Sequence, residues 1–239
     1  MSMETMTRNR SGKSRVLLVD DHPLVRRGVA DVIAHETDME VCGEAADVAE
    51  AIQEVERTQP DLVLVDLALR SGHGLELIEK LKARDPRIKT LVSSMHDETL
   101  FAERVLQAGA MGYITKQESP EMLIRACRQV LRGELYLSQR MTSRLLHRVA
   151  GGGPPREDPV QSLSNREVEV YEMIGQGLTV QQIAVRLHLS PKTVETHREK
   201  IKQKLSLKSS AELSRRAVQW VLERGWSTSA SENQPRGGQ

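Results

Sequence analysis

Aromatic residues are scarce in this 239-residue sequence, which contains one phenylalanine, three tyrosines and two tryptophans. Hydrophobic residues of all kinds nevertheless make up 38% of the chain. A chain of this length is long enough for one large domain or two ordinary ones. The core must therefore be aliphatic and built mainly from leucine, valine, isoleucine and alanine.

Long apolar segments are also missing. No run is long enough to cross a bilayer. The polar residues 1–13 lack the apolar stretch of a secretory signal peptide. We therefore expect a cytoplasmic protein without a membrane partner.

Cysteine is rare, since only Cys42 and Cys127 are present and they do not form a CxxC pair. The sequence therefore has neither the spacing of a zinc site nor the framework of a disulfide-rich domain. We expect two buried, reduced thiols.

Charge is distributed unevenly, although the formal net charge of the whole chain is only +1. Residues 13–137 contain 16 basic and 22 acidic residues, whereas residues 160–224 contain 11 basic and 7 acidic ones. An acidic first half and a basic second half indicate two domains with different partners, and the basic half suits a polyanion.

A segment rich in glycine and proline, GGGPPREDP at 151–159, separates the two halves. Such a composition is typical of a linker. We expect a first domain over 14–137, a linker with one possible helix over 138–160, a second domain over 161–224, and disordered ends at 1–13 and 225–239.

Two periodicities alternate in the first half. Short runs rich in valine, leucine and isoleucine predict strands, and segments with helical spacing lie between them. The expected strands are 15–20, 40–44, 61–66, 89–94 and 111–115. Five strand–helix repeats predict an α/β domain of the doubly wound, flavodoxin-like (βα)5 type, which binds ligands at the carboxyl ends of its parallel strands.

Three acidic residues stand at such strand ends: Asp20 and Asp21 follow the apolar run 16–19, and Asp66 follows the apolar run 62–65. In a parallel sheet these ends share one edge, so the carboxylates converge and repel one another unless a cation lies among them. Mg²⁺ meets this need because it prefers oxygen ligands. An aspartate at such a site can act as a nucleophile and form an acyl phosphate.

Two further polar residues complete the set. Ser94 ends the fourth strand and can donate a hydrogen bond to a phosphoryl oxygen. Lys116 follows the fifth strand, and its ammonium can pair with Asp66 or with a phosphoryl group. Acids, a hydroxyl and a lysine in this order are far more specific than any one of them alone.

The motifs around these residues resemble the receiver domain of NarL/FixJ-type response regulators. They are VLLVDDHPLVRRGV at 16–29, VLVDLALRSGHGLELI at 63–78, SSMHDE at 93–98 and AGAMGYITK at 108–116. The resemblance implies that Asp66 accepts a phosphoryl group from a sensor histidine kinase, and that Mg²⁺ is held by Asp20, Asp21, Asp66 and the backbone carbonyl of Ala68. Ser94, Tyr113 and Lys116 match the residues that contact the phosphoryl group and switch.

The chain departs from the family after the phosphoacceptor. Relatives usually have Pro-Gly there, whereas this loop reads Arg70-Ser71-Gly72-His73. His96 is expected in a surface loop near the site rather than in catalysis.

The second half has the pattern of a small all-α helix-turn-helix domain. Helices are expected at 165–175, 180–188, 191–205 and 211–224. Ser164 and Glu167 have capping-box spacing, Thr179 and Ser190 are suited to cap the next two helices, and Pro191 suits a first helical position. The third helix has one apolar stripe and one long polar face, as in a helix that enters the major groove.

The segment LSNREVEVYEMIGQGLTVQQIAVRLHLSPKTVETH (163–197) resembles the LuxR-type helix-turn-helix. The resemblance places Glu195, Thr196 and Glu199 toward the bases. It makes Lys192, Thr193, Arg198, Lys200 and Lys208 phosphate contacts. Many relatives have lysine in place of the two glutamates, so the preferred DNA sequence does not carry over.

These features favour a regulator that is phosphorylated on Asp66, binds DNA and forms a homodimer when phosphorylated. One alternative is a DNA-binding regulator that ignores phosphorylation and uses the receiver only for dimerisation. Another is a phosphatase with Asp66 as its nucleophile. The chain has no obvious second catalytic acid and no substrate cap, so we do not expect an enzyme.

Overall fold

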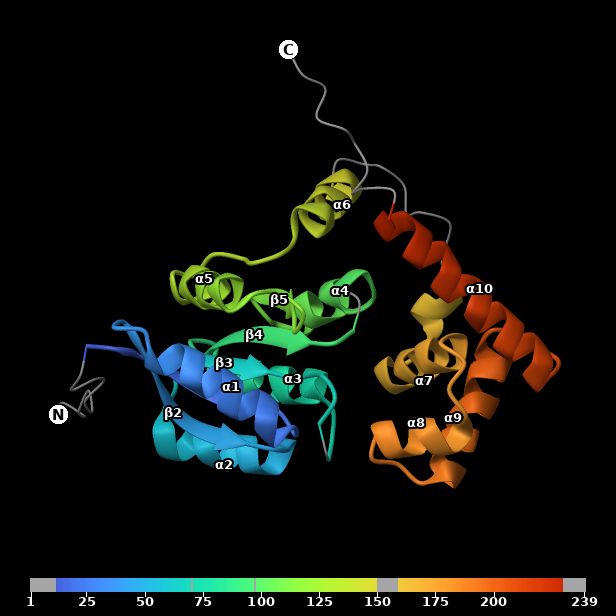
Figure 1. Cartoon of the computed structure of the whole chain (residues 1–239), viewed down its shortest axis with the longest axis horizontal. Coiled ribbons are helices and arrows are strands. Elements are labelled where there is room, and N and C mark those ends of the chain that lie inside the picture. Colours follow the sequence, from blue (N-terminus) through green and yellow to red (C-terminus); the bar gives the residue numbers. More distant parts are fainter. Residues whose placement is uncertain (1–11, 70, 97, 150–158, 230–239) are drawn as a thin grey trace, which may run out of the picture. The chain divides into compact units, whose positions relative to one another are not determined.

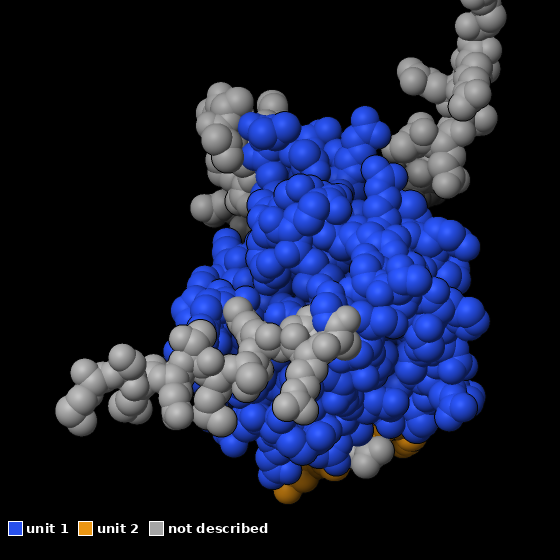
Figure 2. Space-filling model, turned by 90° about the vertical axis from the view of Figure 1, so that its left-hand side faces the viewer, with its two compact units in different colours: residues 1–152 blue, residues 153–239 orange. Residues whose placement is uncertain are grey.

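The computed structural model describes residues 12–69, 71–96, 98–149 and 159–229. The chain divides into two compact units, Met1–Gly152 and Gly153–Gln239, which are coloured separately in Figure 2. The first unit alternates strands and helices, and the second is helical (Figure 1).

The first unit contains five strands and six helices among its described residues. The strands are β1 (Ser14–Val19), β2 (Met39–Ala45), β3 (Leu62–Val65), β4 (Lys89–Ser94) and β5 (Gly112–Thr115). The helices are α1 (Pro23–Ala34), α2 (Val48–Thr58), α3 (Gly74–Arg84), α4 (Glu98–Ala108), α5 (Pro120–Leu131) and α6 (Gln139–Val149). The predicted doubly wound α/β fold is confirmed.

The strands pair in parallel in the order β2-β1-β3-β4-β5. Chain order reverses direction between β1 and β3, which is the switch point where doubly wound sheets open a crevice for ligands. Asp20, Asp21 and Asp66 follow these two strands. The topology therefore decides where the acids meet.

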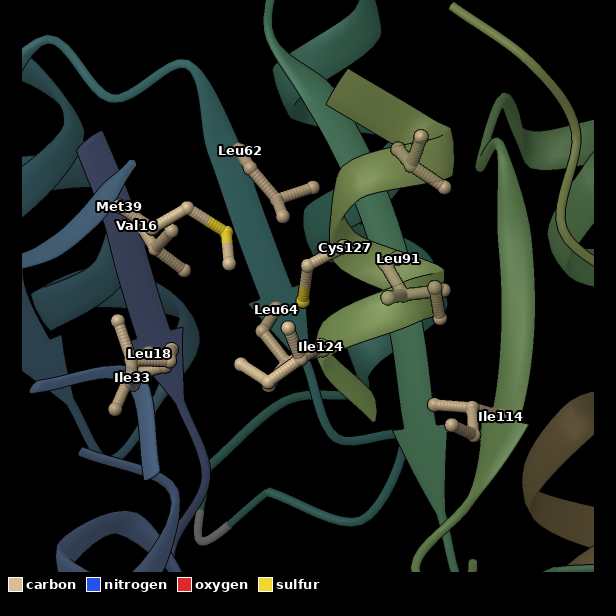
Figure 3. Packing of buried hydrophobic residues seen from close by; sticks show 12 residues of the cluster. Val16, Leu18, Ile33, Met39, Leu62, Leu64, Leu91, Ile114, Ile124 and Cys127 are labelled. Atoms are coloured by element: carbon tan, nitrogen blue, oxygen red, sulfur yellow. The ribbon is translucent and has the colours of Figure 1, made fainter. Parts of the chain in front are cut away.

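An aliphatic core fills one side of the sheet. Figure 3 shows Ile33 of α1 and Ile124 and Cys127 of α5 among side chains from all five strands. Strand residues alternate between the faces, so Val16 and Leu18 belong to this cluster whereas Leu17 and Val19 lie on the other face. Both cysteines are free, and only Cys127 is fully buried.

The segment after α5 returns to the sheet. Tyr113 N–H donates to the Tyr136 carbonyl at 3.0 Å, and Tyr136 N–H donates to the Met111 carbonyl at 3.0 Å. Met141 of α6 is buried, and the Ser138 hydroxyl oxygen accepts from the Met141 N–H at the start of this helix. The linker region therefore begins as an ordered part of the first unit.

The second unit consists of a short 3₁₀ turn, η1 (Pro159–Ser162), and four helices among its described residues. These are α7 (Asn165–Gly175), α8 (Val180–Arg186), α9 (Pro191–Lys204) and α10 (Ser210–Ser229). No described helix in the chain meets the length and hydropathy needed to span a bilayer.

Two helix ends in the second unit differ from the prediction by more than one residue. Helix α8 ends at Arg186 rather than His188, because His188 has a φ of +51° that no helix accommodates. Helix α10 continues to Ser229, five residues beyond the predicted end at residue 224. Gly225 weakens a helix by only about 1 kcal/mol, and no proline follows until Pro235. Residues 230–239 and 1–11 lie outside the described residues.

Candidate functional site

Three acids meet at the carboxyl ends of β1 and β3. Asp20, Asp21 and Asp66 are 7, 8 and 4% exposed. The Asp66 N–H donates to the Val19 carbonyl at 2.8 Å, which ties the two strand ends together. Ligand atoms of the three acids and of His22 all lie within 4.8 Å of one another.

Lys116 joins this cluster from the end of β5. Its Nζ lies 2.6 Å from Oδ2 of Asp20 and 2.6 Å from Oδ2 of Asp66. Burial opposes the charge on Lys116, but the carboxylates of Asp66 and Asp20 raise its pKa above the ordinary value. The ammonium is therefore a fixed positive charge beside both acids.

Burial also disfavours the charged form of Asp66. It raises the pKa of this carboxyl to about 6, although the positive charge of Lys116 lowers that pKa in part. One ammonium lies against the two carboxylates of Asp20 and Asp66, and Asp21 adds a third carboxylate to the cluster, so negative charge stays in excess. His22 Nδ1 lies 2.6 Å from Oδ1 of Asp21. The donor set of carboxylate oxygens with residual negative charge fits a small divalent cation such as Mg²⁺.

The loop after Asp66 has its own local geometry. Ala68 pairs with His73 across the loop in an isolated bridge, and Gly72 adopts a φ of +86°. His73 Nδ1 accepts a hydrogen bond from the Leu75 N–H at 3.1 Å and so caps α3. The described part of this loop is therefore shaped by the positive φ of Gly72 and the His73 cap; Arg70, where the family resemblance leads one to expect proline, lies outside the described residues.

Ser94 and Tyr113 are both hydrogen-bonded to the backbone of His96, which follows β4. The fully buried Ser94 accepts a hydrogen bond from the His96 N–H at 3.3 Å through its hydroxyl oxygen. The Tyr113 hydroxyl, which is also buried, donates to the His96 carbonyl at 2.8 Å. His96 is itself 9% exposed, and its ring lies 5.0 Å from that of Phe101. The expectation of a surface position for His96 is therefore wrong, because a neighbouring strand and helix cover it.

Sequence reasoning missed two residues that shape this site. Arg26 of α1 donates a hydrogen bond to the Asp20 carbonyl and another to Glu44. Gly74 begins α3 so close to Asp66 that an added Cβ would lie 2.2 Å from the Asp66 carbonyl oxygen. A glycine directly before the helical spacing of Leu75, Leu77, Ile78 and Leu81 was the available signal for the second of these.

The helical unit is held by caps and buried ion pairs. Ser164 and Glu167 form a capping box on α7, and Glu167 also pairs with Lys204 of α9 at 2.6 Å. Arg166 binds the fully buried Glu169 at 2.7 Å and donates to the Leu187 carbonyl at 3.0 Å. These contacts join α7 to α9 and to the turn after α8, so they orient α9.

Helix α9 begins where Ser190 accepts from the Thr193 N–H, and it carries most of the residues predicted to contact DNA. Val194 and Ile201 are buried, whereas Lys192, Glu195, Thr196, Glu199 and Lys200 are exposed. Thr193 and Arg198 are half-buried, and Lys208 is exposed in the segment before α10. The structure therefore places an exposed polar face on α9, with Lys208 beyond its end.

Comparisons with known proteins agree with this architecture. The response regulator receiver domain model matches residues 16–128, and the model of bacterial regulatory proteins of the luxR family matches residues 161–217. The oxygen regulatory protein NreC of Staphylococcus carnosus is 38% identical over 215 residues, covering 88% of this chain and 97% of that protein.

Solved structures give the same picture. A LuxR-family two-component response regulator from Aurantimonas is 33% identical with a TM-score of 0.54, covering 58% of this chain and 99% of that chain. RcsB of Salmonella enterica serovar Typhimurium, bound to the promoter rprA with the phosphomimetic BeF3⁻, is 26% identical with a TM-score of 0.56; the match covers 85% and 97% of the two chains. The chain therefore belongs to the two-component response regulators that control transcription through a receiver domain and a LuxR-type DNA-binding domain.

Proposed function

We propose that Asp66 is the phosphoacceptor of this regulator and that a sensor histidine kinase is its donor. A carboxylate oxygen of Asp66 attacks the phosphorus of the donor phosphohistidine, the phosphorus–nitrogen bond breaks, and an acyl phosphate forms. The observation that carries the proposal is the Lys116 ammonium, 2.6 Å from both Asp66 and Asp20. It supplies positive charge at the point where phosphoryl oxygens would arrive.

The acids also provide a metal site. Asp20, Asp21, Asp66 and the Ala68 carbonyl would hold Mg²⁺, with His22 keeping Asp21 oriented through the 2.6 Å contact. When bound, Mg²⁺ neutralises the carboxylates and the incoming phosphoryl oxygens. Arg26 fixes the backbone at Asp20, so the site keeps its shape before the cation enters.

Ser94, His96 and Tyr113 link the site to the rest of the receiver. In the proposed mechanism the Ser94 hydroxyl turns to donate to a phosphoryl oxygen and releases the His96 N–H that it holds at 3.3 Å. Movement at His96 then disturbs its carbonyl, which is the acceptor of the Tyr113 hydroxyl at 2.8 Å. Phosphorylation would thus change the packing of Tyr113 through two named hydrogen bonds.

Helix α9 is the proposed DNA interface. Lys192, Thr193, Arg198, Lys200 and Lys208 would contact phosphates, and Glu195, Thr196 and Glu199 would face the bases. A phosphorylated homodimer would bind two half-sites. The exposed apolar residues Val218 and Leu222 of α10, 39 and 58% exposed, support this helix as the surface where the protomers meet.

The decisive experiment measures DNA affinity of the full chain with and without Mg²⁺ and acetyl phosphate or beryllofluoride, on fragments selected from the source genome. Tighter binding with the phosphoryl mimic, lost in Asp66→Asn and kept in Asp31→Asn, is the expected result. Asp31 is a matched control because it is exposed on α1. Phosphate uptake from acetyl phosphate by Asp66→Asn at the wild-type level would contradict the assignment.

Two other outcomes have distinct meanings. Equal DNA affinity with and without the phosphoryl mimic would favour a regulator that does not depend on phosphorylation. Repeated turnover of a phosphoester would favour a phosphatase. We propose instead that each chain takes up one phosphoryl group.

A further inference from the structure

Three side chains of α9 are proposed to face the bases, namely Glu195, Thr196 and Glu199, and none of them offers a hydrogen-bond donor to DNA. Glu195 and Glu199 carry carboxylates, which only accept. The Thr196 hydroxyl donates its proton to the Lys192 carbonyl at 3.0 Å. Its oxygen is therefore available only as an acceptor, so these three side chains form a row of acceptors, with Lys192 and Lys200 as exposed donors on the same helix.

Two cationic side chains of the same helix, Arg198 and Lys202, lie beside the two glutamates of this row. Arg198 Nε lies 3.5 Å from Oε2 of Glu195, and Lys202 Nζ lies 2.8 Å from Oε1 of Glu199. The side chains of Arg198 and Lys202 are only 16 and 17% exposed, whereas those of Glu195 and Glu199 are 53 and 60% exposed. The carboxylates therefore project outward with their counter-charges packed beside the helix.

We infer that Glu195 and Glu199 read cytosine in the major groove, which rests on the proposed role of α9 as the DNA interface. Side chains that only accept need donors on the base edges. The major groove offers them at cytosine N4 and adenine N6. Adenine presents the acceptor N7 beside its donor, which repels a carboxylate, whereas cytosine has no acceptor on that edge. Cytosine is therefore the base that these glutamates prefer.

The spacing of the two glutamates adds a second constraint. They are four residues apart on one helix face, which corresponds to about 6 Å along the helix axis. Base pairs follow one another every 3.4 Å or so along a DNA strand. Two cytosine-containing pairs separated by about two base-pair steps are expected in each half-site.

The competing interpretation is that the glutamates only repel phosphates. Paired with Arg198 and Lys202, they would lower affinity for every sequence equally and select none. The two interpretations predict different behaviour when the carboxylates are removed.

The test is selection from a random double-stranded DNA library by the full chain, with Mg²⁺ and beryllofluoride present. The expected motif contains the two cytosine pairs. Changing one of them to T·A should weaken wild-type binding by about tenfold or more. In Glu199→Ala the same change at its cytosine should cost less than about threefold, while the other position keeps its full effect.

Glu195→Ala is the matched control, because it should lose selectivity only at the other cytosine. Glu199→Gln should shift preference toward adenine, since an amide both donates and accepts. Lys200→Ala should weaken all sequences alike and reduce the salt dependence of binding.

Three results would overturn the inference. A clear motif without the cytosine pairs would refute it and leave the DNA interface intact. Alanine variants that bind every sequence more tightly with unchanged preference would show that the glutamates act only by repulsion. A chain that binds no DNA would remove the proposed interface and this inference together.

Discussion

The Lys116 ammonium lies 2.6 Å from Oδ2 of Asp66, although fifty residues separate them in the chain. It makes the same approach to Asp20. All three side chains are nearly buried, so each charge depends on the others for compensation. The stability of the receiver therefore depends on how this cluster is charged.

Replacing Lys116 by glutamine should destabilise the receiver when no metal is present. Breaking a buried ion pair by removing one partner costs about 3–5 kcal/mol, because the remaining charge is left uncompensated. Calorimetry of the full chain in a chelator should show a lower unfolding temperature for the receiver. Excess Mg²⁺ should restore part of the loss, and Lys116→Arg should lose less. An unfolding temperature unchanged by Lys116→Gln would contradict this account of the cluster.

Asp66→Asn should have a pH-dependent effect on stability in metal-free buffer. The folded chain raises the pKa of Asp66 from 3.8 to about 6, so its proton stabilises the folded state below about pH 4, and this contribution disappears as the pH rises through 6. The asparagine variant lacks this loss. Its stability relative to wild type should rise between about pH 4 and 6 and level off at no more than about 3 kcal/mol.

The same stability measurement is repeated with a control variant and with added Mg²⁺. Asp31→Asn should show no such pH-dependent gain. Saturating Mg²⁺ should reverse the order at neutral pH, because the cation binds the carboxylate and not the amide. A constant difference between pH 4 and 7 would refute the proposed role of Asp66 burial.

Gly74→Ala should damage the phosphorylation site. Its Cβ would lie 2.2 Å from the Asp66 carbonyl oxygen and 2.9 Å from Leu67 Cα, so the backbone must shift. We expect a loss of about 1–3 kcal/mol and slower phosphorylation from acetyl phosphate. Gly28→Ala is the control. It meets nothing within 4 Å on the exposed side of α1 and should stabilise the chain by about 1 kcal/mol.

Tyr113→Phe should leave phosphorylation intact and weaken the gain in DNA affinity that follows it. The variant loses only the hydroxyl that donates to the His96 carbonyl at 2.8 Å, and an unsatisfied buried carbonyl costs about 1–3 kcal/mol. Phosphate uptake should persist, because Asp66 and Lys116 are untouched. The gain in DNA affinity on phosphorylation should shrink. Full retention of that gain would show that Tyr113 is only a packing residue.

Much of the molecule follows from local patterns in the sequence. Alternating strand and helix periodicities predicted the doubly wound sheet. The positions of Asp20, Asp66, Ser94 and Lys116 at the ends of apolar strand runs predicted these residues as one set. The capping positions of the second unit were equally readable, because a cap involves residues only three positions apart. Such features depend on short-range geometry that the sequence itself contains.

Other features required the folded chain. The burial of His96 against Phe101, the hydrogen bond that Tyr113 donates to it, and the contact of Gly74 with the Asp66 carbonyl all depend on how elements pack. The exposed row of acceptors on α9 also became visible only with side-chain positions, because exposure separates Glu195 and Glu199 from their paired cations. The sequence by itself determined which chemical groups stand at each strand end and helix start, since local spacing sets those places. Only the tertiary structure decided which groups form ion pairs, form hydrogen bonds or pack together in the interior, because those contacts join residues that are distant in the chain.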